Sequence, residues 1–118
     1  MLQSTISMLR TRDAKKSEAF YCGLLGFETA WEYDPGDGYP VFLEVARDQV
    51  AFHLSEHDGD GPMGIQIYIN VEDAKALHQE LTSRGTLILE ASHEAEWGHV
   101  VFSLEDPDGN TLRFGSPL

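Results

Sequence analysis

The chain has 118 residues, a length that suits one compact domain with a real hydrophobic core. Eight basic against twenty acidic side chains give a formal net charge of −12, which argues against nucleic acid and anionic membranes as partners. The single cysteine, Cys22, excludes an internal disulfide. Because no apolar run is long enough to span a bilayer and residues 1–10 lack a signal-peptide pattern, we expect a reduced, cytoplasmic protein.

In chain order, the first half predicts a strand, a helix and three further strands. The helix is expected over Asp13–Gly26, because aspartate is a good helix N-cap and glycine commonly follows a helix end. The expected strands, from apolar alternation bounded by turn residues, are Ser4–Thr11, Phe27–Tyr33, Tyr39–Ala46 and Gln49–Ser55.

The second half repeats this order sixty residues later. Asp73 opens a helix that ends at Gly85, and both helices begin with Asp-Ala-Lys. The expected strands are Gly64–Val71, Thr86–Ala91, Trp97–Leu104 and Thr111–Phe114, the last two joined by the turn Asp106-Pro-Asp-Gly-Asn110. We therefore predict an α+β fold in one domain, residues 1–118. It would consist of two tandem βαβββ modules (about 1–57 and 64–118, with a connector at about 56–63) whose curved mixed sheets surround a concave pocket.

Four positions are expected to meet on the concave faces of the two sheets. The offset of sixty pairs Ile6 with Gln66, and His53 with Arg113. Period-two alternation places each of them opposite the apolar face that a helix would cover. They are predicted to line one cavity together, with Tyr68, Ser55 and Thr111 as neighbours.

Several of these residues also have a plain structural interpretation. His53 can be a strand histidine satisfied by neighbouring hydrogen bonds or a polar group of the pocket, and His99 has the same two roles open to it. Arg113 can pair with an acidic neighbour such as Glu44, or bind an anionic or carbonyl group of a ligand. Cys22 is expected to be a buried small hydrophobe. The other histidines are expected at the surface: His57, His78 and His93.

Three segments, RTRDAKKSEAFYCGLLGFE, FHLSEHDGDGP and EWGHVVFSLEDPDGNTLRF, together resemble the glyoxalase/bleomycin-resistance/dioxygenase group, the vicinal oxygen chelate superfamily. The resemblance covers nearly the whole chain and implies the same paired βαβββ fold. Metal-dependent members carry His, Glu, His and Glu at the four facing positions. The matching positions here are Ile6, His53, Gln66 and Arg113. Isoleucine has no donor atom and arginine is a permanent cation, so we expect no metal and no cofactor.

The chain is most similar to the bleomycin-resistance branch of this superfamily, whose members bind a drug and sequester it. The resemblance implies a homodimer with pockets lined by both subunits, and a small-molecule ligand that is cationic and aromatic, such as bleomycin. Tyr68 falls where the branch carries a stacking tryptophan, Trp97 matches the tryptophan before the penultimate strand, and Tyr39 falls near another aromatic. The expected ligand-binding set is Tyr39, His53, Gln66, Tyr68, Trp97, His99 and Arg113, with no catalytic residue.

Two other functions remain open at the level of sequence. One is a metal-dependent lyase or dioxygenase with an altered site that uses His53, Gln66 and His99. The other is an interaction module whose pocket is vestigial. The fold alone does not choose among these, because one scaffold of this kind hosts many activities.

Overall fold

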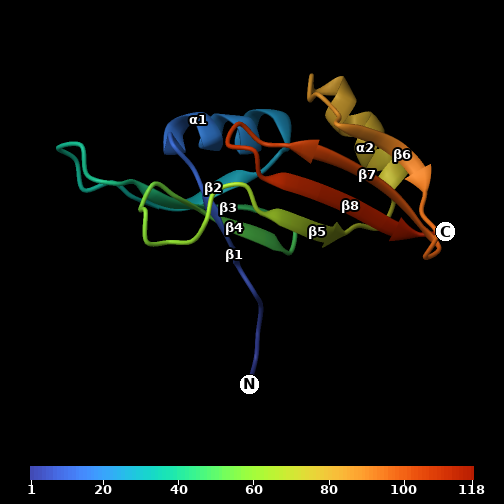
Figure 1. Ribbon diagram of the computed structural model, residues 1–118, viewed down its shortest axis with the longest axis horizontal. Helices are drawn as coiled ribbons and strands as arrows, with labels where there is room; N and C mark the ends of the chain where they lie inside the picture. Colours follow the sequence, from blue (N-terminus) through green and yellow to red (C-terminus); the bar gives the residue numbers. More distant parts are fainter.

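The computed structural model describes all 118 residues and divides into two similar halves (Figure 1). The elements of the first half are β1 (Ser7–Arg10), α1 (Ala14–Ala19), the π-helical turn η1 (Phe20–Leu24), β2 (Glu28–Tyr33), β3 (Phe42–Arg47) and β4 (Val50–Ser55). Those of the second half are β5 (Gln66–Asn70), α2 (Ala74–Ser83), β6 (Glu90–Glu94), β7 (His99–Glu105) and β8 (Thr111–Pro117). Neither α-helix is both long and apolar enough to cross a membrane.

Each half forms its own four-stranded mixed sheet with the same strand order, β1-β4-β3-β2 and β5-β8-β7-β6. The first and last strands of each half pair in parallel, and their registers correspond. Met8 lies opposite His53 in the first sheet, and Tyr68 lies opposite Arg113, sixty residues later, in the second. The predicted α+β fold of two βαβββ units is confirmed. The two sheets do not close on each other within one chain.

The helix starts show the same repeat at the level of backbone angles. Asp13 has φ −145° and ψ 100°, and Asp73 has φ −145° and ψ 99°. Each aspartate side chain accepts hydrogen bonds from amides of the first helical turn, as an N-cap should. Gly85 follows the second helix with φ 93°, in the left-handed region that glycine adopts without strain.

Both helices cover the same side of the two sheets (Figure 1). The covered sides are filled with buried apolar side chains, among them Phe52 and Leu54 in β4 and Leu112 and Phe114 in β8. Because side chains alternate along a strand, the residues between these pairs point to the opposite side. We call the two uncovered sides the first open face (strands β1–β4) and the second open face (strands β5–β8).

Some observed strands are shorter than predicted, because the apolar pattern in the sequence extends past the residues that pair with a neighbouring strand. Strand β1 begins at Ser7 instead of Ser4, because residues 1–6 leave the sheet and project from the body (Figure 1). Strand β6 begins at Glu90 instead of Thr86. The Thr86 amide bonds to the Leu81 carbonyl at the helix end, and the apolar Leu87 that follows is exposed. The first helix also widens into the π-helical turn after Ala19.

Two aromatic residues predicted within strands lie in turns. The Tyr39 amide donates to the Gly36 carbonyl at 3.1 Å, three residues before β3 begins. Trp97 precedes Gly98, which has φ 83° and donates to the Ala95 carbonyl, so that β7 begins only at His99. Turn residues of this kind point outward instead of joining a ladder of strand hydrogen bonds.

Candidate functional site

The seven predicted site residues fall into separate groups in this structure. Gln66, Tyr68 and Arg113 share the second open face, and His53 lies on the first. Trp97 and His99 lie at the start of β7, and Tyr39 lies in the β2–β3 loop. A single chain therefore does not bring His53 and Arg113 into one pocket, because they belong to sheets that do not close on each other.

The first open face carries an aromatic cluster around one histidine. The Nε2 atom of His53 lies 2.9 Å from a carboxylate oxygen of Glu44, which is its direct neighbour on β3. The rings of Trp31 and Phe42 stack at 5.5 Å between centroids, and both meet the His53 imidazole edge to face, at 5.4 and 4.9 Å. His53 is thus both a satisfied strand histidine and part of an aromatic surface, and Glu44 pairs with it instead of with Arg113.

The predicted site lacks Trp31, Phe42 and Glu44. The sequence does contain a signal for two of them, Phe42 and Glu44. Leu43 and Val45 are fully buried on the covered side of β3. Period-two alternation then places Phe42 and Glu44 on the first open face beside His53. The antiparallel register that brings Glu44 opposite His53 depends on the short β3–β4 turn, which has Asp48 at φ 52°.

The second open face is built around Arg113 on β8. Its neighbours in register are Tyr68 on β5 and Ser103 on β7. The ring of Tyr68 lies flat across the sheet, so that a Cβ atom added to Gly115 would fall 1.9 Å from the Tyr68 hydroxyl. Gly115 is therefore the residue that lets this ring lie against the backbone. The Nε atom of Arg113 is buried and has no hydrogen-bond partner.

Of the three remaining predicted residues, Tyr39 and Trp97 are exposed and His99 is half-buried. Tyr39 is 66% exposed and Trp97 is 56% exposed. Tyr39 lines a shallow pocket of about 600 Å³ with Tyr33 and Phe42. Nδ1 of His99 lies 3.4 Å from the Trp97 carbonyl, so the ring stays beside its own turn.

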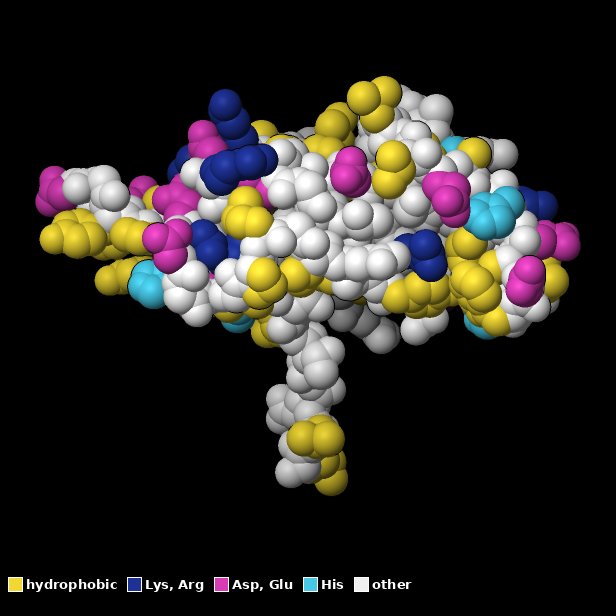
Figure 2. Space-filling view, in the orientation of Figure 1, with side chains coloured by type: hydrophobic (Ala, Val, Ile, Leu, Met, Phe, Trp, Pro, Cys, Tyr) yellow, Lys and Arg dark blue, Asp and Glu magenta, His cyan; other side chains and the backbone are white.

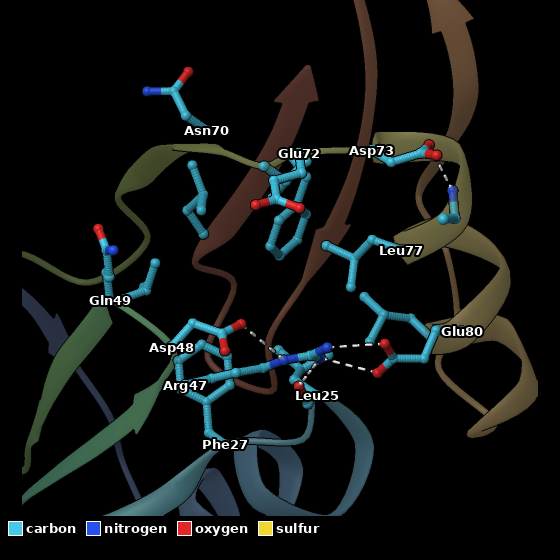
Figure 3. Close-up of a pocket in the computed structure, with 16 residues that line it drawn as sticks. Leu25, Phe27, Arg47, Asp48, Gln49, Asn70, Glu72, Asp73, Leu77 and Glu80 are labelled. Carbon is cyan, nitrogen blue, oxygen red and sulfur yellow. Dashed lines mark hydrogen bonds and ion pairs between the residues drawn. The ribbon is translucent and has the colours of Figure 1, made fainter.

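A cavity of about 640 Å³ lies away from these residues, in the junction between the two halves (Figure 3). Ile69 and Phe114, which line it, point to the covered side of their strands, opposite to Tyr68 and Arg113. Arg47 extends across the cavity and donates to the Leu25 carbonyl and to both carboxylate oxygens of Glu80. The cavity is therefore crossed by an ion pair that joins the two halves.

The Arg47–Glu80 contact changes the titration of both groups. The hydrogen bond from Arg47 lowers the pKa of Glu80 below its ordinary 4.5, with Arg84 adding to the effect. The same hydrogen bond raises the pKa of Arg47. Both shifts follow from a charge-assisted bidentate pair.

The four facing positions do not fit the metal of the superfamily's enzymes. His53 is engaged by Glu44, Ile6 lies before β1 and has no donor, and Arg113 places a permanent cation on the other sheet. No group of three or more His, Cys, Asp or Glu side chains is arranged to hold a metal ion.

The other singled-out side chains have structural roles. His57 and His93 are exposed, as predicted. The prediction for His78 is wrong, because its ring is half-buried, stacks on Phe102 at 5.2 Å and contacts the Ser92 hydroxyl. Cys22 is half-buried, not fully buried, and packs against the hydrophobic core.

The comparisons with known proteins agree with this architecture. A family model described as "Glyoxalase superfamily protein" matches residues 1–117. No curated protein matches. Among solved structures, the bleomycin resistance determinant encoded on the transposon Tn5 has a TM-score of 0.80 at 23% identity, covering 98% of each chain.

Two further solved structures share the fold. A bleomycin-binding protein in complex with bleomycin has a TM-score of 0.79 at 24% identity, covering 99% of this chain and 100% of that one. TnmS3, an antibiotic-binding protein from Streptomyces sp. CB03234, has a TM-score of 0.75 at 22% identity, covering 100% and 99%. At these identities the likeness shows a common fold. Because the family model spans residues 1–117, the chain belongs to the glyoxalase superfamily.

Proposed function

We propose that this protein binds a small aromatic molecule and sequesters it without converting it, as a homodimer whose pockets are lined by both subunits. The observation that carries this proposal is the distribution of aromatic side chains. Both tryptophans and three of the four tyrosines are exposed, whereas all six phenylalanines are half-buried or buried. Tyrosine and tryptophan combine a large apolar face with a polar end, which suits a surface that meets a ligand.

The exposed aromatics on the two open faces offer stacking surfaces of the right kind. Trp31 is 44% exposed above the Phe42 and His53 rings, and Tyr68 is 42% exposed beside Arg113. A flat ligand that stacks on one such ring gains roughly 0.5–1.5 kcal/mol beyond the burial of its area. Each open face supplies one wall for such a ligand, and a pocket needs a second wall.

A second copy of the chain can supply that wall. If the first open face of one subunit faced the second open face of the other, a ligand would lie between the His53 cluster and Arg113. Residues 1–6 also project from the body with exposed apolar Met1, Leu2 and Ile6 (Figure 2). An apolar arm of this kind is stabilised when it packs against another surface, which supports a dimer.

Two of the structural relatives support antibiotics as the class of ligand to test first. One relative is a bleomycin-binding protein and another is described as antibiotic-binding. The net charge of −12 attracts cationic ligands such as bleomycin from a distance. Tyr68 in place of a tryptophan, and the positive charge of Arg113, count against tight binding of bleomycin itself.

The proposal is tested by calorimetry and tryptophan fluorescence on the purified chain, titrated with bleomycin, ethidium and 2-naphthoate. We expect at least one probe to bind and to raise the melting temperature. Trp31→Phe should remove most of the quenching of fluorescence by that probe, because Trp31 is the exposed ring of the aromatic cluster on the first open face. Light scattering should give the mass of a dimer. Absence of heat and of stabilisation with every probe would contradict the proposal.

A metal-dependent lyase or dioxygenase is the competing function, and elemental analysis separates the two. We expect the purified protein to hold no stoichiometric nickel, zinc, iron or manganese. A stoichiometric metal that is lost in His53→Ala would replace sequestration with metal chemistry as the proposed function.

A further inference from the structure

Arg113 differs from every other arginine in the chain. The remaining four arginines each form an ion pair with a carboxylate: Arg10 with Asp58 at 3.1 Å, Arg12 with Asp108 at 3.2 Å, Arg47 with Glu80 at 2.8 Å and Arg84 with Glu80 at 3.0 Å. Arg113 forms none, although the chain has twenty acidic residues. In so acidic a protein, an arginine without a carboxylate partner is conspicuous.

The position of Arg113 makes the missing partner costly. It lies in β8, which has β5 on one side and β7 on the other, and its side chain is half-buried. Its Nε atom is buried and makes no hydrogen bond. An Nε–H donor that loses water without gaining an acceptor raises the free energy of the folded state, so an acceptor from outside the chain is favoured at this atom.

The neighbours of Arg113 leave a place for such an acceptor. Tyr68 and Ser103 flank it in register and contribute hydroxyl groups without negative charge. Glu105 lies two residues after Ser103 on β7 and therefore on the same face, is exposed, and forms no ion pair with Arg113. Gly115 leaves room for the Tyr68 ring to lie over β8, and Tyr68 is the residue of β5 that is paired in register with Arg113.

We propose that Arg113 is the counter-ion for a carboxylate carried by the aromatic ligand, with the ring of Tyr68 as the adjoining stacking surface. This inference rests on the proposed function and names the chemical class of the ligand. The planar fork of a guanidinium matches a carboxylate with two parallel hydrogen bonds. A singly charged carboxylate also suits a protein of net charge −12 better than a doubly charged phosphate does, because the protein's field repels the dianion more strongly.

The test uses three probes that share the naphthalene ring and carry an anionic, a neutral or a cationic substituent: 2-naphthoate, 2-naphthamide and 2-naphthylmethylammonium. We expect the full-length protein to bind the carboxylate about 10-fold or more tightly than the amide, as judged by calorimetry. Arg113→Met should remove this preference, and Arg113→Lys should keep only part of it. Arg84→Met, which removes an arginine from an ion pair at the C-terminal end of α2, should leave the preference intact.

The outcomes separate this inference from the proposed function. Equal binding of the three probes would overturn the carboxylate assignment and leave aromatic binding in place. Binding of none of them, with no binding of bleomycin or ethidium, would overturn both. If Arg113→Met instead shifts a dimer to monomers and the probes bind unchanged, the partner of Arg113 is a carboxylate of a second copy, such as its Glu44, and the ligand assignment is wrong.

Discussion

The hydroxyl of Tyr21 donates a 2.8 Å hydrogen bond to Oδ2 of Asp106, which lies 85 residues later in the β7–β8 turn. Tyr21 is fully buried and Asp106 is 6% exposed. The other oxygen of Asp106 accepts from the amides of Asp108 and Asn110, so the turn orients the carboxylate that receives Tyr21. The Asn110 side chain also donates to the Arg10 carbonyl. The Asp-Pro-Asp-Gly-Asn turn is therefore a joint between the halves as well as a hairpin.

Replacing Tyr21 with phenylalanine should weaken this joint. The substitution leaves a buried carboxylate oxygen of Asp106 with one donor fewer, which costs about 1–3 kcal/mol of the free energy of unfolding. Urea denaturation followed by circular dichroism measures it. Tyr33→Phe, at an exposed position, is the matched control and should change stability by less than about 0.5 kcal/mol. Equal effects of the two substitutions would show that the Tyr21 hydrogen bond is not stabilising.

The same contact predicts a loss of stability at alkaline pH. Burial raises the pKa of Tyr21 well above its ordinary 10.0, and the negative charge of Asp106 raises it further. The unfolded chain therefore loses this proton first, so the contribution is intact below about pH 10 and falls as the pH rises above that value. The free energy of unfolding should decline more steeply above pH 10 in the wild type than in Tyr21→Phe. Parallel declines would contradict the assignment.

The Arg47–Glu80 pair predicts a smaller effect in acid. Because Arg47 holds the pKa of Glu80 below 4.5, the contribution of this carboxylate is present above that pH and is lost as the pH falls through the lower, folded-state value. Glu80→Gln should cost about 1 kcal/mol or less at pH 7, since the Glu80 side chain is 38% exposed and screened by water and salt. The cost should vanish near pH 2. Glu96→Gln, at an exposed residue without an ion pair, should show no such dependence.

Gly115 and Tyr68 should be coupled in stability. A methyl group at position 115 would overlap the Tyr68 ring, so Gly115→Ala should displace the ring or the strand and cost about 1–3 kcal/mol. In a Tyr68→Ala background that overlap is gone, and most of the cost of Gly115→Ala should disappear. A double-mutant cycle by chemical denaturation measures this coupling. Additive effects would mean that the ring does not lie on Gly115.

The regular features of the fold could be predicted because they depend on local sequence. The aspartate caps and the alternation that places Arg113 opposite Leu112 and Phe114 involve residues close together in the chain, and the period of sixty is a repeat of such local patterns. Strand limits were less predictable, because a strand extends only as far as a neighbour offers hydrogen bonds. The exposed Leu87 illustrates this, since its apolar run has the pattern of a strand but lies in the irregular segment between α2 and β6.

By itself the sequence determined the βαβββ repeat, its caps, and which side chains lie on the open faces. Only the tertiary structure decided how those side chains are partnered. Glu44 meets His53 and leaves Arg113 without a carboxylate because strand register, not spacing along the chain, sets which residues are neighbours. Tyr21 finds Asp106 only when the two halves dock. Charge and hydrogen-bond partners across long sequence separations follow from packing, which short-range patterns do not encode.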